Sequence, residues 1–327
     1  MGEFELLARV RERLPAPGSR VLLGSGDDAA VTVPGGATAT SVDALVEGVH
    51  FRRESATLAQ IGRKALATAL SDLAAMGAEA GEAYIAVGIP TDLDEAGCLE
   101  LIDAVVALAA ETGTTVAGGD VTRAPVLALA VTVVGHADSP ERLVGRGGGR
   151  PGDALVLTGE IGGAAAGLLL LQRPQLAMSV PAESAERLRR RQLDPAPRLA
   201  AGQALAAAGA RAMIDLSDGL GGDAAHLAAA SGAAVRIDAA TLPLAPGMAE
   251  IAVAAGRDPL ELAASGGEDY ELLAALPADR LPAATEGLAE AGETTLTRIG
   301  ELVAGEGVEI RLPGGGILAP AGFDQLG

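Results

Sequence analysis

Apolar residues three or four positions apart predict amphipathic helices in the first half of the chain, and alternating or continuous apolar runs predict strands between them. The first helix ends where Pro15 interrupts the pattern. The predicted helices of this half lie at 4–14, 58–76 and 93–110, and the predicted strands at 37–43, 84–89, 114–117 and 126–134. Asp43 is expected to end its strand, and Asp72 to lie beside the apolar face of the second helix.

A segment rich in glycine and arginine, residues 138–152, separates this half from the next. We therefore predict an N-terminal domain at 1–137, a linker at 138–152 and a C-terminal domain at 153–327. The second domain has predicted strands at 154–157 and 212–214, helices at 161–171, 197–208 and 220–230, and a basic cluster at 187–191 that is interpreted as a solvated helix face. The irregular order of helices and strands favours an α+β fold over a doubly wound parallel sheet.

Acidic residues recur beside glycine or at the ends of predicted elements. The first case is Gly24–Val31, where two glycines are followed by Asp27 and Asp28. The others are Asp43, Asp72, Gly118–Asp120, Asp215–Gly219, Asp223 and Gly267–Asp269. Any one of them could be a turn or a helix cap. Their recurrence indicates a centre of several carboxylates, and such hard oxygen ligands suit Mg²⁺ or Ca²⁺.

Composition narrows the classes of partner. The 327 residues carry a net charge of −19, aromatic residues are 2%, and Lys64 is the only lysine. Such a chain repels nucleic acid and offers few rings on which bases could stack. The single cysteine, Cys98, is interpreted as a buried, inert thiol. No run of 18 apolar residues occurs, so we expect no membrane association and a cytoplasmic location.

The familiar phosphate-binding and hydrolytic motifs are missing. The sequence has no G-x-x-x-x-G-K-[ST] loop, no protein-kinase signature, no G-x-S-x-G elbow and no H-E-x-x-H. The remaining carboxylates and glycine loops fit phosphoryl transfer assisted by several Mg²⁺ ions. If the acceptor is itself a phosphate, with a second pKa of about 6, it needs no general base. This agrees with the lack of a convincing catalytic histidine.

Two residues keep alternative interpretations. His50, beside Phe51, is on residue grounds a packed or capping histidine rather than a functional one. Arg146 is either a solvated linker arginine or a phosphate-facing one. Neither choice follows from local pattern alone.

An ordered set of short motifs resembles the thiamine-monophosphate kinase family from end to end. The motifs are Gly2–Phe4, Gly26–Ala30, Ser71–Ala78, Gly118–Arg123, Ile214–Leu220 and Gly267–Leu272. The resemblance implies the two-domain fold shared with aminoimidazole ribonucleotide synthetase, with an N-terminal α/β domain that dimerises through its sheet and a C-terminal α+β domain. It implies ATP-dependent phosphorylation of thiamine monophosphate to thiamine diphosphate by a homodimer.

The resemblance also implies roles for individual residues. The implied metal ligands are Asp28, Asp43, Asp72, Asp120, Asp215 and Asp218, of which Asp28, Asp120 and Asp218 are the catalytic candidates. The implied ATP contacts are Ser41, Gly119, Asp120, Arg146 and Ser217, and the implied substrate contacts are His50, Glu268 and Phe323. Several Mg²⁺ ions are expected, with K⁺ as a further candidate. Val42 stands where the family often has threonine, so a hydroxyl ligand is absent there.

Two other functions remain open at the level of sequence. Another ATP-dependent enzyme of the same superfamily, such as aminoimidazole ribonucleotide synthetase, would use similar carboxylates. A non-catalytic cation-binding protein is a further alternative, although no D-x-[DN]-x-[DN]-G loops occur.

Overall fold

The chain folds into two compact units. The computed structural model describes residues 3–25, 29–292, 295–319 and 321–322. Unit 1 comprises residues 1–73 and 78–140, and unit 2 comprises residues 74–77 and 141–327. Each unit is described by itself, and the predicted domain bounds stay a prediction.

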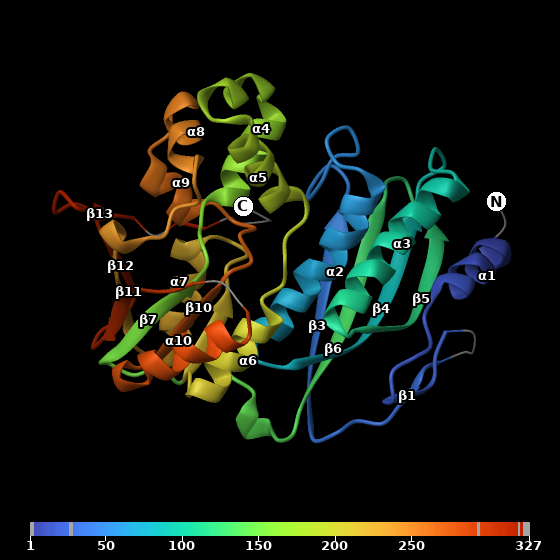
Figure 1. Ribbon diagram of the computed structural model, residues 1–327, viewed down its shortest axis with the longest axis horizontal. Coiled ribbons are helices and arrows are strands. Elements are labelled where there is room, and N and C mark those ends of the chain that lie inside the picture. Colours follow the sequence, from blue (N-terminus) through green and yellow to red (C-terminus); the bar gives the residue numbers. More distant parts are fainter. Residues whose placement is uncertain (1–2, 26–28, 293–294, 320, 323–327) are drawn as a thin grey trace. The chain divides into compact units, whose positions relative to one another are not determined.

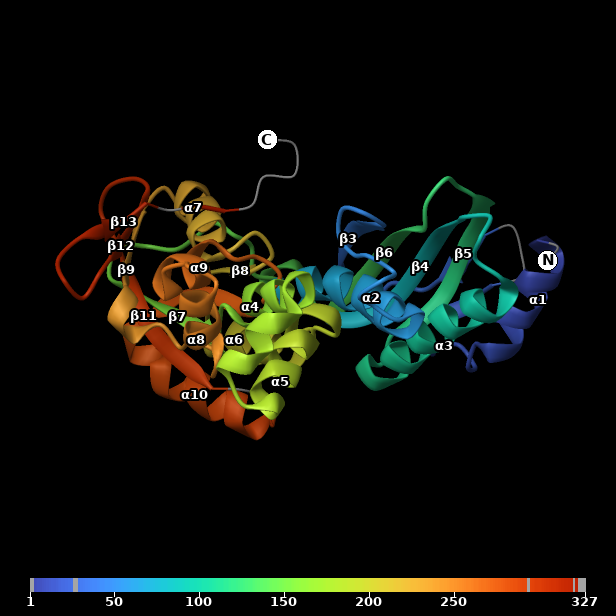
Figure 2. The same ribbon diagram turned by 90° about the horizontal axis from the view of Figure 1, so that it is seen from above.

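Unit 1 is a four-stranded sheet with helices on one face (Figures 1 and 2). The strand order is β3-β6-β4-β5, in which only β4 and β5 are parallel. The strands are β3 (Ala37–Val46), β4 (Glu79–Ile89), β5 (Thr115–Arg123) and β6 (Ala128–Ala137), and the helices are α1 (Glu3–Arg13), α2 (Leu58–Ala75) and α3 (Glu95–Thr112). A separate hairpin joins β1 (Val21–Leu23) to β2 (Val31–Thr32).

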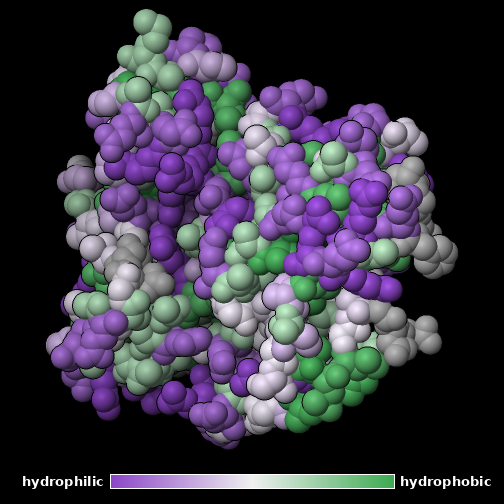
Figure 3. Space-filling model, turned by 45° about the vertical axis from the view of Figure 1, so that its right-hand side comes forward, coloured by the Kyte–Doolittle hydropathy of each residue, from purple (hydrophilic) through white to green (hydrophobic). Residues whose placement is uncertain are grey.

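Local chemistry explains where the long helices of unit 1 begin, end and pack. Asp94 accepts a hydrogen bond from Gly97 N at the start of α3, and Gly113 ends that helix in the left-handed conformation. In α2, the apolar positions that predicted a helix are fully buried. The hairpin, in contrast, leaves apolar side chains in contact with solvent, because Leu22 and the adjoining Val33 are half or more exposed. Figure 3 shows a hydrophobic area at the lower right of its view.

Two sequence predictions about unit 1 are wrong. Asp43 does not end its strand, because β3 continues to Val46 and Asp43 pairs with Val131 of β6. Gly119 and Asp120 do not form a loop after a strand, because both lie inside β5. The hydrogen-bonded pairing of β5 with β4 continues past the double glycine. A run of small residues gives no alternating apolar pattern, so the sequence did not predict this continuation.

Unit 2 is a seven-stranded sheet in the order β13-β12-β9-β11-β7-β10-β8, antiparallel except for β9 with β12. Its strands are β7 (Asp153–Thr158), β8 (Ala212–Asp215), β9 (Ala234–Asp238), β10 (Leu272–Pro277), β11 (Leu296–Val303), β12 (Val308–Arg311) and β13 (Ile317–Leu318). Its helices are α4 (Gly163–Gln172), α5 (Ala182–Leu193), α6 (Leu199–Ala208), α7 (Leu220–Ser231), α8 (Met248–Ala254), α9 (Pro259–Ser265) and α10 (Leu281–Glu290).

Helices cover both faces of this sheet. One apolar cluster joins α6 and α10 to β7 and β10, and another joins α4, α7, α8 and α9 to the opposite face. The mixed architecture confirms the predicted α+β class. Among the described segments, none of the helices combines the length and the apolar character needed to cross a membrane.

Candidate active site

In unit 1, a pair of carboxylates lies between the sheet and α2. Ser41 Oγ donates a hydrogen bond to Asp72 Oδ2, and Thr68 donates one to Asp43. Burial raises the pKa of Asp43, and the neighbouring Asp72 raises it further. Two carboxylates this close together are the chemistry that a divalent cation relieves.

His50 lies in the turn that follows β3. Its Nδ1 accepts a hydrogen bond from Val46 N at 3.0 Å, so Nε2 carries the proton of the neutral ring. This is the capping role predicted from local sequence. A contact between Nε2 and a substrate stays a prediction, because the cap leaves that nitrogen uncommitted among the described residues.

Asp120 lies on the other side of the sheet from Asp43. The register places Asp43, Val131, Ile85 and Gly119 in one row across the four strands. Because neighbouring strand residues point to opposite faces, the side chain of Asp120 projects away from α2 and α3. Three strand spacings, about 14 Å, also separate the two strands. A single copy of unit 1 therefore does not bring Asp43 and Asp120 together.

Gly119 is required by close packing within the sheet. A Cβ atom at this position would lie 2.2 Å from Ile85 O. Gly119 and Asp120 also border a small apolar cavity of about 60 Å³ between α1, α3, β4 and β5. Because Gly119 has no side chain, β5 can pair closely with β4 beside Asp120, and the backbone there stays accessible.

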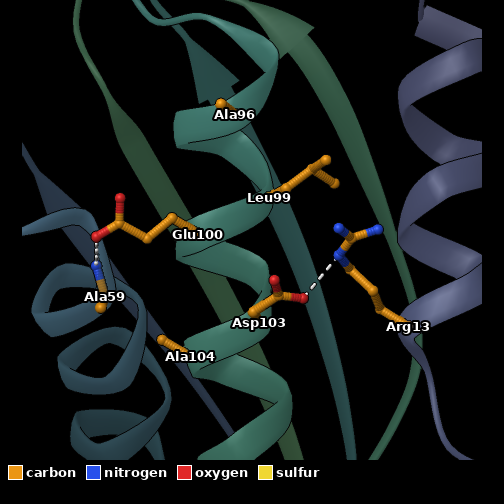
Figure 4. Close-up of a pocket in the computed structure, with 7 residues that line it drawn as sticks. All are labelled: Arg13, Ala59, Ala96, Leu99, Glu100, Asp103 and Ala104. Atoms are coloured by element: carbon orange, nitrogen blue, oxygen red, sulfur yellow. Dashed lines mark hydrogen bonds and ion pairs between the residues drawn. The ribbon is translucent and has the colours of Figure 1, made fainter.

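A larger surface groove of about 560 Å³ lies over α1, α2 and α3 and contains none of the predicted site residues (Figure 4). Its polar groups contact each other. Arg13 Nε and Asp103 Oδ1 are 2.7 Å apart, and Glu100 Oε1 accepts from Ala59 N at 3.4 Å. We assign it no role.

In unit 2, three acids surround the start of α7. Asp215 ends β8, Asp218 lies in the following loop, and the buried Asp223 accepts a hydrogen bond from Asp218 N at 3.1 Å. Burial, followed by Asp215 and Asp218, raises the pKa of Asp223 to about 8. Gly219 is the N-cap of α7 and no side chain caps the helix there, so a capping role for Ser217 or Asp218 is wrong.

The loop before β10 extends the ladder between β8 and β10 and brings Glu268 beside Ser217. Glu268 N donates to Ser217 O at 2.8 Å. Glu268 and Tyr270 have φ angles of 68° and 51°, a backbone conformation that residues with side chains rarely adopt. A Cβ at Gly267 would lie 2.4 Å from Ser217 O. Strained non-glycine backbone of this kind clusters at ligand sites.

Asp269 and Glu271 anchor this loop, a role that the sequence did not predict for either of them. Asp269 accepts from Gly162 N and Ala164 N at 2.6 and 3.0 Å and so caps α4. Burial, with a smaller contribution from Glu271, raises the pKa of Asp269 to about 6, against the lowering effect of Arg191 and the two backbone N–H groups. Glu271 is fully buried against Arg191 and Arg198. Arg191 was predicted to lie on a solvated face, and that prediction is wrong because the side chain turns inward.

Arg146 is presented by a rigid glycine loop. Met213 N donates to Gly145 O at 2.9 Å, and Ser231 Oγ donates to Arg146 O at 3.3 Å. Gly148 has a φ of 114°, and a Cβ there would lie 2.7 Å from Arg211 O. The Arg146 side chain is exposed, and within unit 2 it pairs with no acid of the described residues. The backbone of Arg146 is therefore held by unit 2, and both interpretations of its exposed side chain stay predictions.

The donors present suit a hard cation, although no group of three acidic, histidine or cysteine side chains within the described residues is arranged to hold a metal. The acids occur as a pair in unit 1 and a trio in unit 2. Of the predicted site, Asp28 and Phe323 lie outside the described residues. The full predicted ligand set therefore stays a prediction.

Comparison with known proteins matches both halves of the chain. The N-terminal domain of AIR synthase related proteins matches residues 26–137, and the C-terminal domain matches residues 150–313. The chain is thus a two-domain protein of the AIR synthase related class.

Relatives narrow the class further. Thiamine-monophosphate kinase of Escherichia coli strain K12 is 41% identical over 280 residues, covering 84% of this chain and 83% of that protein. The crystal structure of thiamine-monophosphate kinase from Stenotrophomonas maltophilia K279a has a TM-score of 0.83 at 37% identity, covering 95% of this chain and 96% of that one. AaThiL complexed with AMPPCP and TMP has a TM-score of 0.77 at 31% identity, covering 87% and 86%. The chain belongs to the thiamine-monophosphate kinase family.

Proposed function

We propose that this protein transfers the γ-phosphoryl group of ATP to the phosphate of thiamine monophosphate and releases thiamine diphosphate and ADP. The bond from the γ-phosphorus to the β–γ bridging oxygen breaks, and a bond to a phosphate oxygen of the acceptor forms in line with it. The observation that carries the proposal is the 41% identity to a thiamine-monophosphate kinase over most of the chain. The carboxylate groups and the exposed Arg146 described above support it.

The proposal assigns each predicted residue a role. Asp28, Asp43, Asp72, Asp120, Asp215 and Asp218 would hold Mg²⁺, with K⁺ as a further candidate, and Asp28, Asp120 and Asp218 act closest to the transferred group. Ser41, Gly119, Asp120, Arg146 and Ser217 bind ATP, and His50, Glu268 and Phe323 bind thiamine monophosphate. Bound Mg²⁺ supplies the positive charge that offsets the triphosphate in a chain with one lysine.

With a phosphate as the acceptor, the proposed reaction needs no general base. Its second ionisation occurs at a pKa of about 6, so it is a dianion at neutral pH and attacks without losing a proton. His50 is committed to Val46 N through Nδ1. The residues therefore orient and neutralise rather than transfer protons.

A homodimer in the cytoplasm, joined through the sheet of unit 1, is part of the proposal. The sheet face away from α2 and α3 exposes Val42 (65%), Ala44, Ala86 and Ala130, a row of small and apolar side chains. Asp120 projects from the same face. Pairing of two such faces would bury this surface and bring Asp120 into the interface.

Product analysis tests the function. The protein is incubated with ATP and Mg²⁺ and, in parallel, with thiamine monophosphate, free thiamine or formylglycinamidine ribonucleotide. We expect thiamine diphosphate and ADP from the monophosphate alone. Turnover of the purine precursor instead would leave the fold assignment intact and indicate that the protein is a synthetase. No turnover of any acceptor would contradict the proposal.

A further inference from the structure

The backbone that leads into α7 has an unusual conformation at Gly219. Gly219 has a φ of 106° and a ψ of 149°, a combination open almost only to glycine. A Cβ there would lie 2.9 Å from Ser265 O. As the N-cap, Gly219 also has no side chain with which to bind the first amides of the helix. Contacts from outside the loop must therefore stabilise this turn.

The first part of the loop is held from the strand side. Backbone hydrogen bonds of 2.8–2.9 Å join Leu216 and Ser217 to residues 268–271. Asp218 and Gly219 follow directly in the chain, at the point where the strand-like pairing gives way to the helix. Their amides meet a different partner, which comes from inside the helix.

Asp223 is that partner. Its Oδ2 accepts a hydrogen bond from Asp218 N at 3.1 Å, and its carboxyl group also receives one from the backbone of Gly219. Asp223 N in turn donates to Gly219 O at 3.0 Å. Helical side chains point towards the N-terminus of their helix, so an acid near the start of α7 can reach back to preceding amides, as the glutamate of a capping box does.

Burial separates Asp223 from the other groups of the loop. Asp223 is 2% exposed, whereas Ser217 and Asp218 are half-buried. Mg²⁺ usually keeps several water molecules, so its protein ligands need access to solvent. The buried carboxyl group is thus placed to hold the loop, and the half-buried groups are placed to contact a ligand.

We propose that Asp223 is a positioning residue, which holds Ser217 and Asp218 in place for a bound nucleotide and metal, and is not itself a metal ligand. This inference rests on the proposed function, in which Ser217 contacts ATP and Asp218 holds Mg²⁺. In the sequence, Asp223 is one of several recurring acids. Its contacts with the amides of Asp218 and Gly219 assign it to the support of the centre rather than to its ligands.

Calorimetric titration of the full-length protein with Mg²⁺ and the non-hydrolysable ATP analogue AMPPCP tests the inference. Asp223→Leu has nearly the same size and no acceptor, so the Kd of the analogue should rise about 10- to 100-fold, the usual effect of losing a group that orients metal ligands. Asp223→Asn keeps one acceptor oxygen and should raise the Kd by only about threefold or less. A rise in Asp223→Asn as large as in Asp223→Leu would overturn the inference, because the negative charge itself would then be required, as in a metal ligand.

Asp238→Leu is the matched control. Asp238 ends β9, is exposed, and accepts a hydrogen bond from Ala240 N at 3.0 Å. Its replacement removes the same kind of bond from a part of unit 2 that contains none of the predicted site residues. It should lower the melting temperature without changing the Kd of the analogue. Equal rises of the Kd in Asp238→Leu and Asp223→Leu would show a general loss of stability and overturn the positioning role.

Amide hydrogen exchange, measured by NMR without any ligand, distinguishes this inference from the function itself. Absence of thiamine diphosphate formation by the unmodified protein would contradict the proposed function alone. In the same protein, the amides of Asp218 and Gly219 should exchange at least about 10-fold more slowly than in an unstructured chain. Asp223→Leu should remove this protection and leave the amides of β8 unchanged. Exchange of both amides at the unstructured rate would overturn the role whatever the reaction, and this measurement does not require a variant to fold.

Discussion

Asp43 and Asp120 show how backbone alternation determines what a carboxylate can reach. Both carry the same chemistry, yet the strand register directs Asp43 toward Asp72 on α2 and Asp120 toward the open face of the sheet. The sequence identified both as candidate ligands but not the faces on which they lie. The face on which each carboxylate lies depends on how the strands pair, and a single sequence does not contain that pairing.

Asp120→Asn should lower kcat by about 100-fold or more while leaving the melting temperature unchanged. The side chain is exposed and forms no ion pair within the described part of unit 1, so its loss removes charge for the triphosphate and little else. Steady-state kinetics and thermal unfolding provide the measurement. Asp279→Asn, at an exposed position of unit 2, is the control. Near-normal kcat in Asp120→Asn would remove Asp120 from the site.

The dependence of the protein's stability on pH should reveal the raised pKa of Asp269. Burial raises its pKa to about 6, so the folded protein holds this proton more tightly than the unfolded chain. Its stabilising contribution is therefore full below about pH 4 and is lost as the pH rises through about 6, by up to about 3 kcal/mol. We expect the free energy of unfolding of the unmodified protein, minus that of Asp269→Asn, to fall over this range. A difference that is flat with pH would contradict the assignment.

Most elements were predictable from the sequence, whereas their contacts were not. Apolar periodicity located α2 and α3 because long helices carry many repeats of one pattern. The predicted strand was shorter than the glycine-rich β5, because small residues give no alternating apolar pattern. Arg191 was predicted on the wrong side of its helix, because its partner Glu271 is 80 residues away.

Two glycines inside helices should respond in opposite directions to alanine. Gly167→Ala places a Cβ 2.1 Å from Leu188 O and should destabilise unit 2 by about 1–3 kcal/mol. Gly287→Ala in α10 meets nothing closer than 3.5 Å and should stabilise by about 0.5–1 kcal/mol through lower chain entropy. Urea unfolding of both variants is the measurement. Equal effects would show that α4 and α5 do not pack as closely as described.

At the scale of the whole molecule, assembly and activity should be linked. Ala130→Arg places a charge at the centre of the exposed sheet face, on a strand flanked by β3 and β4. We expect the mass in solution, measured by light scattering, to fall from that of two chains to one, with activity falling alongside because Asp120 shares this face. Ala289→Arg, exposed on α10, should change neither. A dimer that persists in Ala130→Arg would place the interface elsewhere.

The most direct test of the central claim is a ³¹P NMR time course of one mixture that contains the protein, ATP, Mg²⁺ and thiamine monophosphate. We predict that the resonance of the monoester is replaced by the two coupled resonances of thiamine diphosphate, with one ADP formed for each. Inorganic phosphate accumulating beside unchanged thiamine monophosphate would contradict the claim, because the γ-phosphoryl group would then be passing to water.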